Sequence, residues 1–205
     1  MHKSMAMDLS FPFVGRWLVR NSPANRFPSH GTHLFGAAHA IDFVPVDENG
    51  RTAPLRFGSL VKPEPPSRFP GFGREILAPA AGTIVGVHDG EVDHPAFRGL
   101  PSIQYALTQR SRSLRGWVGL AGNYVFIETQ GAIVALCHLK LGSVRVRVGQ
   151  TVQFGEVLGQ CGNSGNSTEP HVHVQAMDRP NPREARAVAV TFAGSLPRNN
   201  EILQL

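Results

Sequence analysis

Two histidines towards the C-terminal end are spaced so that both can act at one site. His171 and His173 flank Val172 in the segment that follows Pro170. In a β-strand, side chains two positions apart point to the same face, so both imidazoles can reach one metal ion or one reactant. Histidine is the commonest metal ligand and titrates near neutral pH. The pair alone is a weak signal, because two histidines can share a strand face by chance.

Two more polar residues lie inside apolar runs. His138 lies in the run ALCHL at residues 135–139, and Asp42 lies in the run AIDF at residues 40–43. Burying either side chain without a partner is costly, so each needs a cation, a hydrogen-bonding group or a metal. Taken singly, His138 can be a hydrogen-bonded core histidine and Asp42 a strand-end cap. A purely structural role for both of them and for the histidine pair together is much less expected.

The composition is typical of a folded domain built from strands. The 205 residues are 41% hydrophobic and 17% charged, which favours a globule over a disordered chain. The 22 glycines and 16 prolines are typical of short strands joined by tight turns. The formal charge is +5, but the arginines are scattered and do not alternate with aromatic residues. A solvated basic face or a polyanionic substrate fits better than a nucleic acid.

Cysteine usage and the N-terminus bear on the compartment. Cys137 and Cys161 do not form a CxxC pair, so we expect two separate, partly buried thiols, with one disulfide as the alternative. The N-terminus has no continuous apolar run typical of a signal peptide, and no stretch approaches the ~18 apolar residues of a membrane span. As written, the chain is therefore expected to be cytoplasmic, or periplasmic or secreted if a signal was removed.

Alternating apolar residues between turn signals predict an all-β domain of mainly antiparallel strands with long irregular loops. We expect an extended N-terminal arm at residues 1–28, a single domain at 29–195 and a C-terminal tail at 196–205. The loops at 51–73 and 89–115 are long enough to be binding elements that wall a cleft and set specificity. The expected strands are 13–20, 40–46, 83–87, 124–129, 133–139, 144–148, 157–162 and 171–177, with one short helix near 104–113.

Four segments, in the same order, resemble the motifs of the lysostaphin (LytM-type) zinc metallopeptidases. They are LAPAAGTIV at residues 77–85, ALCHL at 135–139, VGQTVQFGEVLG at 148–159 and GNSGNSTEPHVH at 162–173. Together they cover most of residues 76–177. The resemblance implies the open, mainly antiparallel sheet of that family, which is related to duplicated hybrid or biotinyl-like hairpins.

The resemblance also implies a role for each polar residue. His173 and Asp42 would bind one zinc ion, and His171 and His138 would flank the catalytic water. Three protein ligands leave the fourth position of a tetrahedral zinc open for that water, and zinc lowers its pKa towards neutrality. His171 would act as general base, while His138 would steady the developing oxyanion or the water itself.

The first zinc ligand departs from the family pattern. The usual motif has a histidine four residues before the aspartate, and here that position is Ala38. His39 lies three residues before Asp42, a spacing that sends the two side chains to opposite faces of a regular strand unless a bulge intervenes. The segment resembles a divergent branch with a YAIDF-like first motif, which takes its histidine from an upstream loop. We therefore expect His30 as the ligand, with His39 or His33 as the alternatives.

The implied function is a zinc-dependent endopeptidase that cleaves peptide bonds in peptidoglycan cross-links or stem peptides. We expect a peptide or peptidoglycan substrate, no nucleic acid, and a monomer by default. The main rival is a non-catalytic binding or activator module of the same fold. A lipoyl or biotinyl carrier is less favoured, because the only lysine between the two hairpin-like segments, Lys140, lies directly after the His-Leu pair and not in a typical carrier setting.

Overall fold

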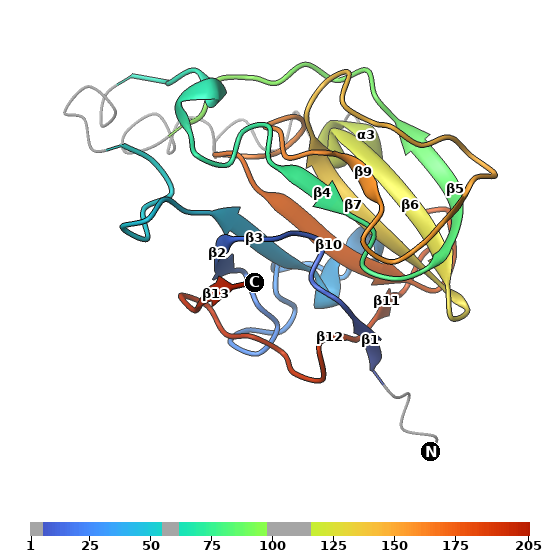
Figure 1. Ribbon diagram of the computed structural model, residues 1–205. Helices are drawn as coiled ribbons and strands as arrows, with labels where there is room; N and C mark the ends of the chain where they lie inside the picture. Colours follow the sequence, from blue (N-terminus) through green and yellow to red (C-terminus); the bar gives the residue numbers. More distant parts are fainter. Residues whose placement is uncertain (1–5, 55–61, 98–115) are drawn as a thin grey trace.

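One large antiparallel sheet organises the protein (Figure 1). The computed structural model describes residues 6–54, 62–97 and 116–205. Within these residues the sheet has nine strands, and the prediction of an all-β, mainly antiparallel fold is confirmed. From edge to edge the strands are β13 (Ile202–Gln204), β2 (Arg16–Arg20), β3 (Ile41–Pro45), β10 (Val172–Met177), β7 (Ala132–Leu139), β6 (Asn123–Thr129), β5 (Gly82–His88) and β8 (Thr151–Val152), while β11 (Ala187–Val188) pairs with β10.

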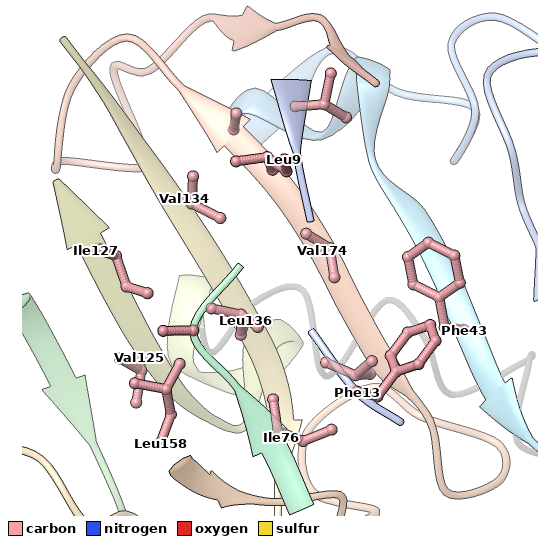
Figure 2. Close-up of a cluster of buried hydrophobic side chains, with 14 of the residues drawn as sticks. Leu9, Phe13, Phe43, Ile76, Val125, Ile127, Val134, Leu136, Leu158 and Val174 are labelled. Carbon is pink, nitrogen blue, oxygen red and sulfur yellow. The ribbon is translucent and has the colours of Figure 1, made fainter. Parts of the chain in front are cut away.

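Two small sheets cover one face of the large one and enclose the main core. They are the parallel pair β1 (Met7–Leu9) and β12 (Val190–Phe192), and the antiparallel pair β4 (Glu75–Leu77) and β9 (Val157–Gln160). Figure 2 shows Leu9, Ile76 and Leu158 among buried side chains that include Leu136 and Val174 of the large sheet. Because side chains alternate along a strand, the residues next to Leu136 and Val174 belong to the other face.

That other face carries a smaller apolar cluster and two short helical segments. Ala135 and Cys137 of β7 and Met177 of β10 pack there, and Trp117 of helix α3 (Gly116–Ala121) packs against the same cluster. The 3-10 segment η1 (Leu34–His39) contacts β10 and β11 on the adjoining part of the fold. Asp42, His138, His171 and His173 border a cleft that residues of η1 and α3 also line.

The predicted strands are confirmed with one exception. The segment 144–148 is not a strand, so that prediction is wrong. Its Arg145 N–H donates to Leu158 O at 2.9 Å, but this contact does not extend into a ladder, and the ladder partner of β9 is β4. The helix expected near 104–113 lies outside the described residues, as do parts of both long loops. The described parts of those loops hold the short 3-10 segment η3 (Pro66–Arg68) and an antiparallel bridge between Glu64 and Ala96.

Segments near both ends of the described chain lie in the sheets. The expected N-terminal arm contributes β1 and β2, and the expected tail contributes β13, which pairs with β2. Cys137 and Cys161 are both free, so the prediction of two separate thiols is confirmed, but both are fully buried and not partly buried as expected. Among the described residues, no helix is long and apolar enough to cross a membrane.

Candidate metal centre

The strand register brings Asp42 and His173 side by side. His173 of β10 is the register partner of Asp42 on β3 and of Cys137 on β7. Partners in an antiparallel ladder point to the same face, which here is the face opposite the main core. The neighbours of His173 on its strand, Val172 and Val174, point into that core. The period of two therefore separates core residues from site residues along β10.

A bulge places His138 on the same face. The β6–β7 ladder pairs Tyr124 with Cys137 and Asn123 with Leu139, which leaves His138 as an extra residue. Its φ is +63°, a left-handed conformation that a non-glycine residue rarely adopts. A regular strand would have turned its side chain into the core beside Leu136. The bulge turns the ring towards the site instead, 4.6 Å from the ring of His171.

Three side chains offer ligand atoms that converge on one point. The His173 Nδ1 atom lies 2.9 Å from Asp42 Oδ1, and the His30 Nε2 atom lies 3.1 Å from Asp42 Oδ2. The ligand atoms of the three residues all lie within 4.8 Å of one another. Two imidazole nitrogens and a carboxylate oxygen are a donor set that suits zinc. The residues present therefore fit the metal that the sequence resemblance implies.

His171 lies beside this trio without joining it. Its Nε2 atom is 3.8 Å from Asp42 Oδ1, and its ring lies against the ring of His138. Both His138 and His171 are more than nine-tenths buried, although they border the cleft. The structure thus brings together all five residues expected at the site: His30, Asp42, His138, His171 and His173.

Backbone carbonyls accept hydrogen bonds from the Nδ1 atoms of His138 and His171. His138 Nδ1 lies 2.9 Å from Ser164 O, and His171 Nδ1 lies 2.8 Å from Glu169 O. A carbonyl only accepts a hydrogen bond, so each Nδ1 carries the proton. In their neutral forms both rings therefore present an unprotonated Nε2 to the site. Both carbonyls belong to the glycine- and serine-rich loop before β10, which explains why that loop accompanies the histidine pair.

Burial and charge set the protonation of the site. Burial raises the pKa of Asp42, but the charges of His30 and His171 and the hydrogen bonds from His173 and His30 outweigh it and hold that pKa well below its usual range. Burial lowers the pKa of His30, and the charge and hydrogen bond of Asp42 reverse this into a raised pKa. Burial and the charges of His171 and His173 hold the pKa of His138 well below its usual range. His138 is therefore neutral near pH 7.

The lowered pKa of His138 predicts a stability loss in acid for the metal-free protein. Below pH 6.5, the ordinary value for histidine, the unfolded chain binds a proton at this position that the folded protein excludes. The contribution of His138 to the free energy of unfolding is therefore fully present above pH 6.5 and is lost as pH falls below it. The limiting slope is about 1.4 kcal/mol per pH unit for one proton. Urea unfolding in the presence of a chelator should show a shallower slope for His138→Gln than for the wild type.

Other histidines do not mimic this effect. The raised pKa of His30 stabilises the folded protein below pH 6.5, and this contribution is lost as pH rises above 6.5. Its pH dependence is therefore opposite to that of His138 and falls at higher pH. The pKa of His39 is lowered by burial and by the charge of His33, and this contribution is the same in wild type and variant. An identical acid slope in His138→Gln would contradict the prediction.

The five residues border a cleft of about 650 Å³. Its walls combine apolar side chains with polar ones, namely Leu34, Phe35, Trp117, Leu120, Arg26, Asn166 and Thr168. The alternative first ligands lie elsewhere, because His33 and His39 line a second cavity with Phe27. The structure thus places His30, and neither of the alternatives, beside Asp42.

Sequence reasoning missed four residues that support the site. Asn21 Nδ2 donates to Asp42 Oδ2 at 2.6 Å, and Ser29 Oγ lies 3.0 Å from His30 Nδ1. Ser167 Oγ lies 3.0 Å from His171 Nδ1, and Gln175 Oε1 lies 2.9 Å from His173 Nε2. Only Gln175 had a usable signal, because it follows His173 by two positions and so shares its face.

Comparison with known proteins matches part of the chain to a peptidase family. The sequence profile of peptidase family M23 matches residues 108–185, which include His138, His171 and His173. The chain is 36% identical over 78 residues to the peptidoglycan DD-endopeptidase ShyA of Vibrio cholerae, covering 38% of this chain and 18% of ShyA. It is 32% identical over 63 residues to the glycyl-glycine endopeptidase ALE-1 of Staphylococcus capitis, covering 30% of this chain and 17% of ALE-1.

Residues 108–185 thus match a peptidase domain of family M23. The matched segment is similar to peptidases of the lysostaphin/LytM type, and the match spans less than a fifth of the length of these curated relatives. Asp42 and His30 precede the matched segment, so the M23 profile does not identify them.

Solved structures that this chain resembles include the catalytic domain of lysostaphin from Staphylococcus simulans, with 18% identity and a TM-score of 0.42 over 76% of this chain and 80% of that one. A mutant catalytic domain of the M23 protein EnpA from Enterococcus faecalis has 18% identity and a TM-score of 0.42 over 74% of this chain and 75% of that one.

Proposed function

We propose that this protein is a zinc-dependent endopeptidase that holds one zinc ion with His30, Asp42 and His173. The observation that supports this most is the convergence of their ligand atoms within 4.8 Å at the border of the cleft. When bound, zinc lowers the pKa of a coordinated water and polarises the scissile carbonyl. The remaining chemistry belongs to His138 and His171, whose Nε2 atoms face the same space.

The ring nitrogen that carries the proton indicates the catalytic role of each of these two histidines. The Nδ1 proton of His171 is donated to Glu169 O, so its Nε2 is free to take a proton from water as general base. His138 is neutral near pH 7 and donates its Nδ1 proton to Ser164 O, so its Nε2 can only accept a hydrogen bond. Of the two roles that the sequence left open for His138, this arrangement favours orienting the water over stabilising an oxyanion.

We propose peptide bonds of peptidoglycan, in cross-links or stem peptides, as the substrate. In support of this substrate class, ShyA is a peptidoglycan DD-endopeptidase and ALE-1 is a glycyl-glycine endopeptidase. The cleft is broad enough for a peptide, at about 650 Å³, and the net charge of +5 suits an anionic polymer. The described walls of the cleft favour neither bond over the other.

Metal content of the purified wild-type protein tests the proposal. We expect about one zinc per chain by elemental analysis, and release of peptide fragments from purified peptidoglycan that a chelator abolishes. A wild-type protein that binds no zinc would refute the proposed enzyme and favour the alternative, a non-catalytic binding or activator module.

Substitution of single histidines tests the ligand set. In His30→Ala we expect the zinc affinity to fall by more than the ~10–100-fold typical of changes outside the ligand shell. His33→Ala and His39→Ala are matched controls, since both residues line the second cavity, and they should keep the affinity of the wild type. Loss of zinc in His39→Ala with retention in His30→Ala would reverse the assignment.

A further inference from the structure

Gln175 is a buried polar residue that the proposed chemistry does not use. It lies on β10 two positions after His173, on the same face of the strand, and only 1% of it is exposed. A buried side-chain amide must satisfy both its oxygen and its nitrogen or destabilise the fold. Both of its partners are visible, and one of them is a proposed metal ligand.

The partners determine which way the amide points. Gln175 Nε2 lies 2.8 Å from the backbone oxygen of Phe35, which can only accept a hydrogen bond. The amide nitrogen must therefore face Phe35, and Gln175 Oε1 must face His173 Nε2 at 2.9 Å. An amide oxygen only accepts, so His173 Nε2 carries a proton. His173 Nδ1, which hydrogen-bonds to Asp42 Oδ1 at 2.9 Å in the metal-free protein, is then the nitrogen left for a metal, and metal binding would displace the proton of that bond.

The other end of the amide is held by a constrained turn. Phe35 and Gly36 both have positive φ values, +59° and +71°. A Cβ atom on Gly36 would lie 2.7 Å from Met177 Cγ, so the turn is pressed closely onto β10. This close packing gives the Phe35 carbonyl a defined position against Gln175. The amide therefore cannot turn over without leaving its nitrogen facing His173 and its oxygen facing a carbonyl.

We propose that Gln175 is a positioning residue that keeps the proton of His173 on Nε2 and so leaves Nδ1 for the metal. The proposal rests on the proposed function, because it requires His173 to be a ligand. Groups that hold the second nitrogen of a metal-binding histidine fix its tautomer and orientation, and their loss typically weakens metal binding by ~10–100-fold. Through Phe35, the same amide also ties the ligand to the wall of the cleft.

Two substitutions of similar size separate the contact with His173 from the contact with Phe35. Gln175→Met removes both, whereas Gln175→Glu keeps an oxygen towards His173 Nε2 and loses the donor to Phe35 O. We expect the zinc affinity, measured by chelator competition, to fall ~10–100-fold in Gln175→Met and to stay within about threefold of wild type, or to rise, in Gln175→Glu. Thermal unfolding of the metal-free variants checks that both are folded.

Each pattern of zinc affinities has one meaning. Equal affinities in wild type and both variants would overturn the proposal while leaving the zinc enzyme intact. An equal loss in both variants would show that Gln175 acts only by anchoring Phe35, which also overturns it. A wild-type protein without zinc affinity would instead refute the proposed function itself.

A measurement on the wild type covers the case in which Gln175→Met does not fold. In the zinc-loaded protein, ¹⁵N-resolved NMR should show the His173 proton on Nε2 and the metal-bound signal on Nδ1. A proton on Nδ1 with metal on Nε2 would overturn the proposal.

Discussion

Replacing His173 by alanine is expected to release the bound zinc and to abolish peptide cleavage. His173 Nδ1 lies 2.9 Å from Asp42 Oδ1, and the two side chains are fixed as register partners on β10 and β3. Zinc contributes several kcal/mol of transition-state stabilisation, so its loss should lower kcat/KM by about 10³-fold or more. Elemental analysis and the initial rate of cleavage, measured on the same preparation, check both parts of the result.

His33→Ala is the matched control for this substitution, because it removes an imidazole that lines the second cavity. It should keep both the zinc and the cleavage rate of the wild type. His173→Ala also leaves Asp42, which is only 5% exposed, without one of its hydrogen-bond partners, and this loss can destabilise the fold. The stability of the variant should therefore be compared with that of the metal-free wild type. A His173→Ala protein that keeps its zinc would show that His173 is not a ligand.

Replacing His171 by alanine is expected to stop the chemistry while leaving the metal in place. His171 Nε2 lies 3.8 Å from Asp42 Oδ1, and its Nδ1 proton is donated to Glu169 O. These contacts fit the proposed role of His171 as a base beside the proposed metal ligands. Loss of a general base typically costs ~10²–10⁴-fold in rate, so kcat should fall by that factor while zinc content stays near that of the wild type.

The same experiment separates the two histidines of the pair. If His171→Ala and His173→Ala lose zinc to the same extent, both are ligands and the proposed division between base and ligand is wrong. If His171→Ala keeps both its zinc and its rate, the general base is another group. Ser167→Ala removes only the hydroxyl near His171 Nδ1 and keeps the Glu169 carbonyl, so its effect on kcat should be smaller than that of His171→Ala.

The identity of the strands and of the residues on them could be predicted because both depend on local pattern. The apolar runs at 40–46 and 133–139 and the alternation along 171–177 indicate strands, and β3, β7 and β10 form there. The common face of His171 and His173 follows from the period of two alone. The segment 144–148 alternates and still forms no strand, although its Arg145 N–H donates to Leu158 O of β9. Alternation shows that a segment can pair, whereas actual pairing depends on the neighbours that the tertiary structure brings to it.

The completion of the site was decided by contacts between distant parts of the chain. His30, His33 and His39 are indistinguishable in residue type, and the turn of the chain before β3 brings His30 to Asp42 while His33 and His39 line another cavity. His138 reaches the cleft only because a bulge in the β6–β7 ladder reverses its side chain. The sequence by itself thus determined which strands form and which residue types lie on one face, because backbone alternation is a local property. Only the tertiary structure decided which histidine stands beside Asp42 and which nitrogen of each ring faces the cleft, because both depend on partners contributed by other segments.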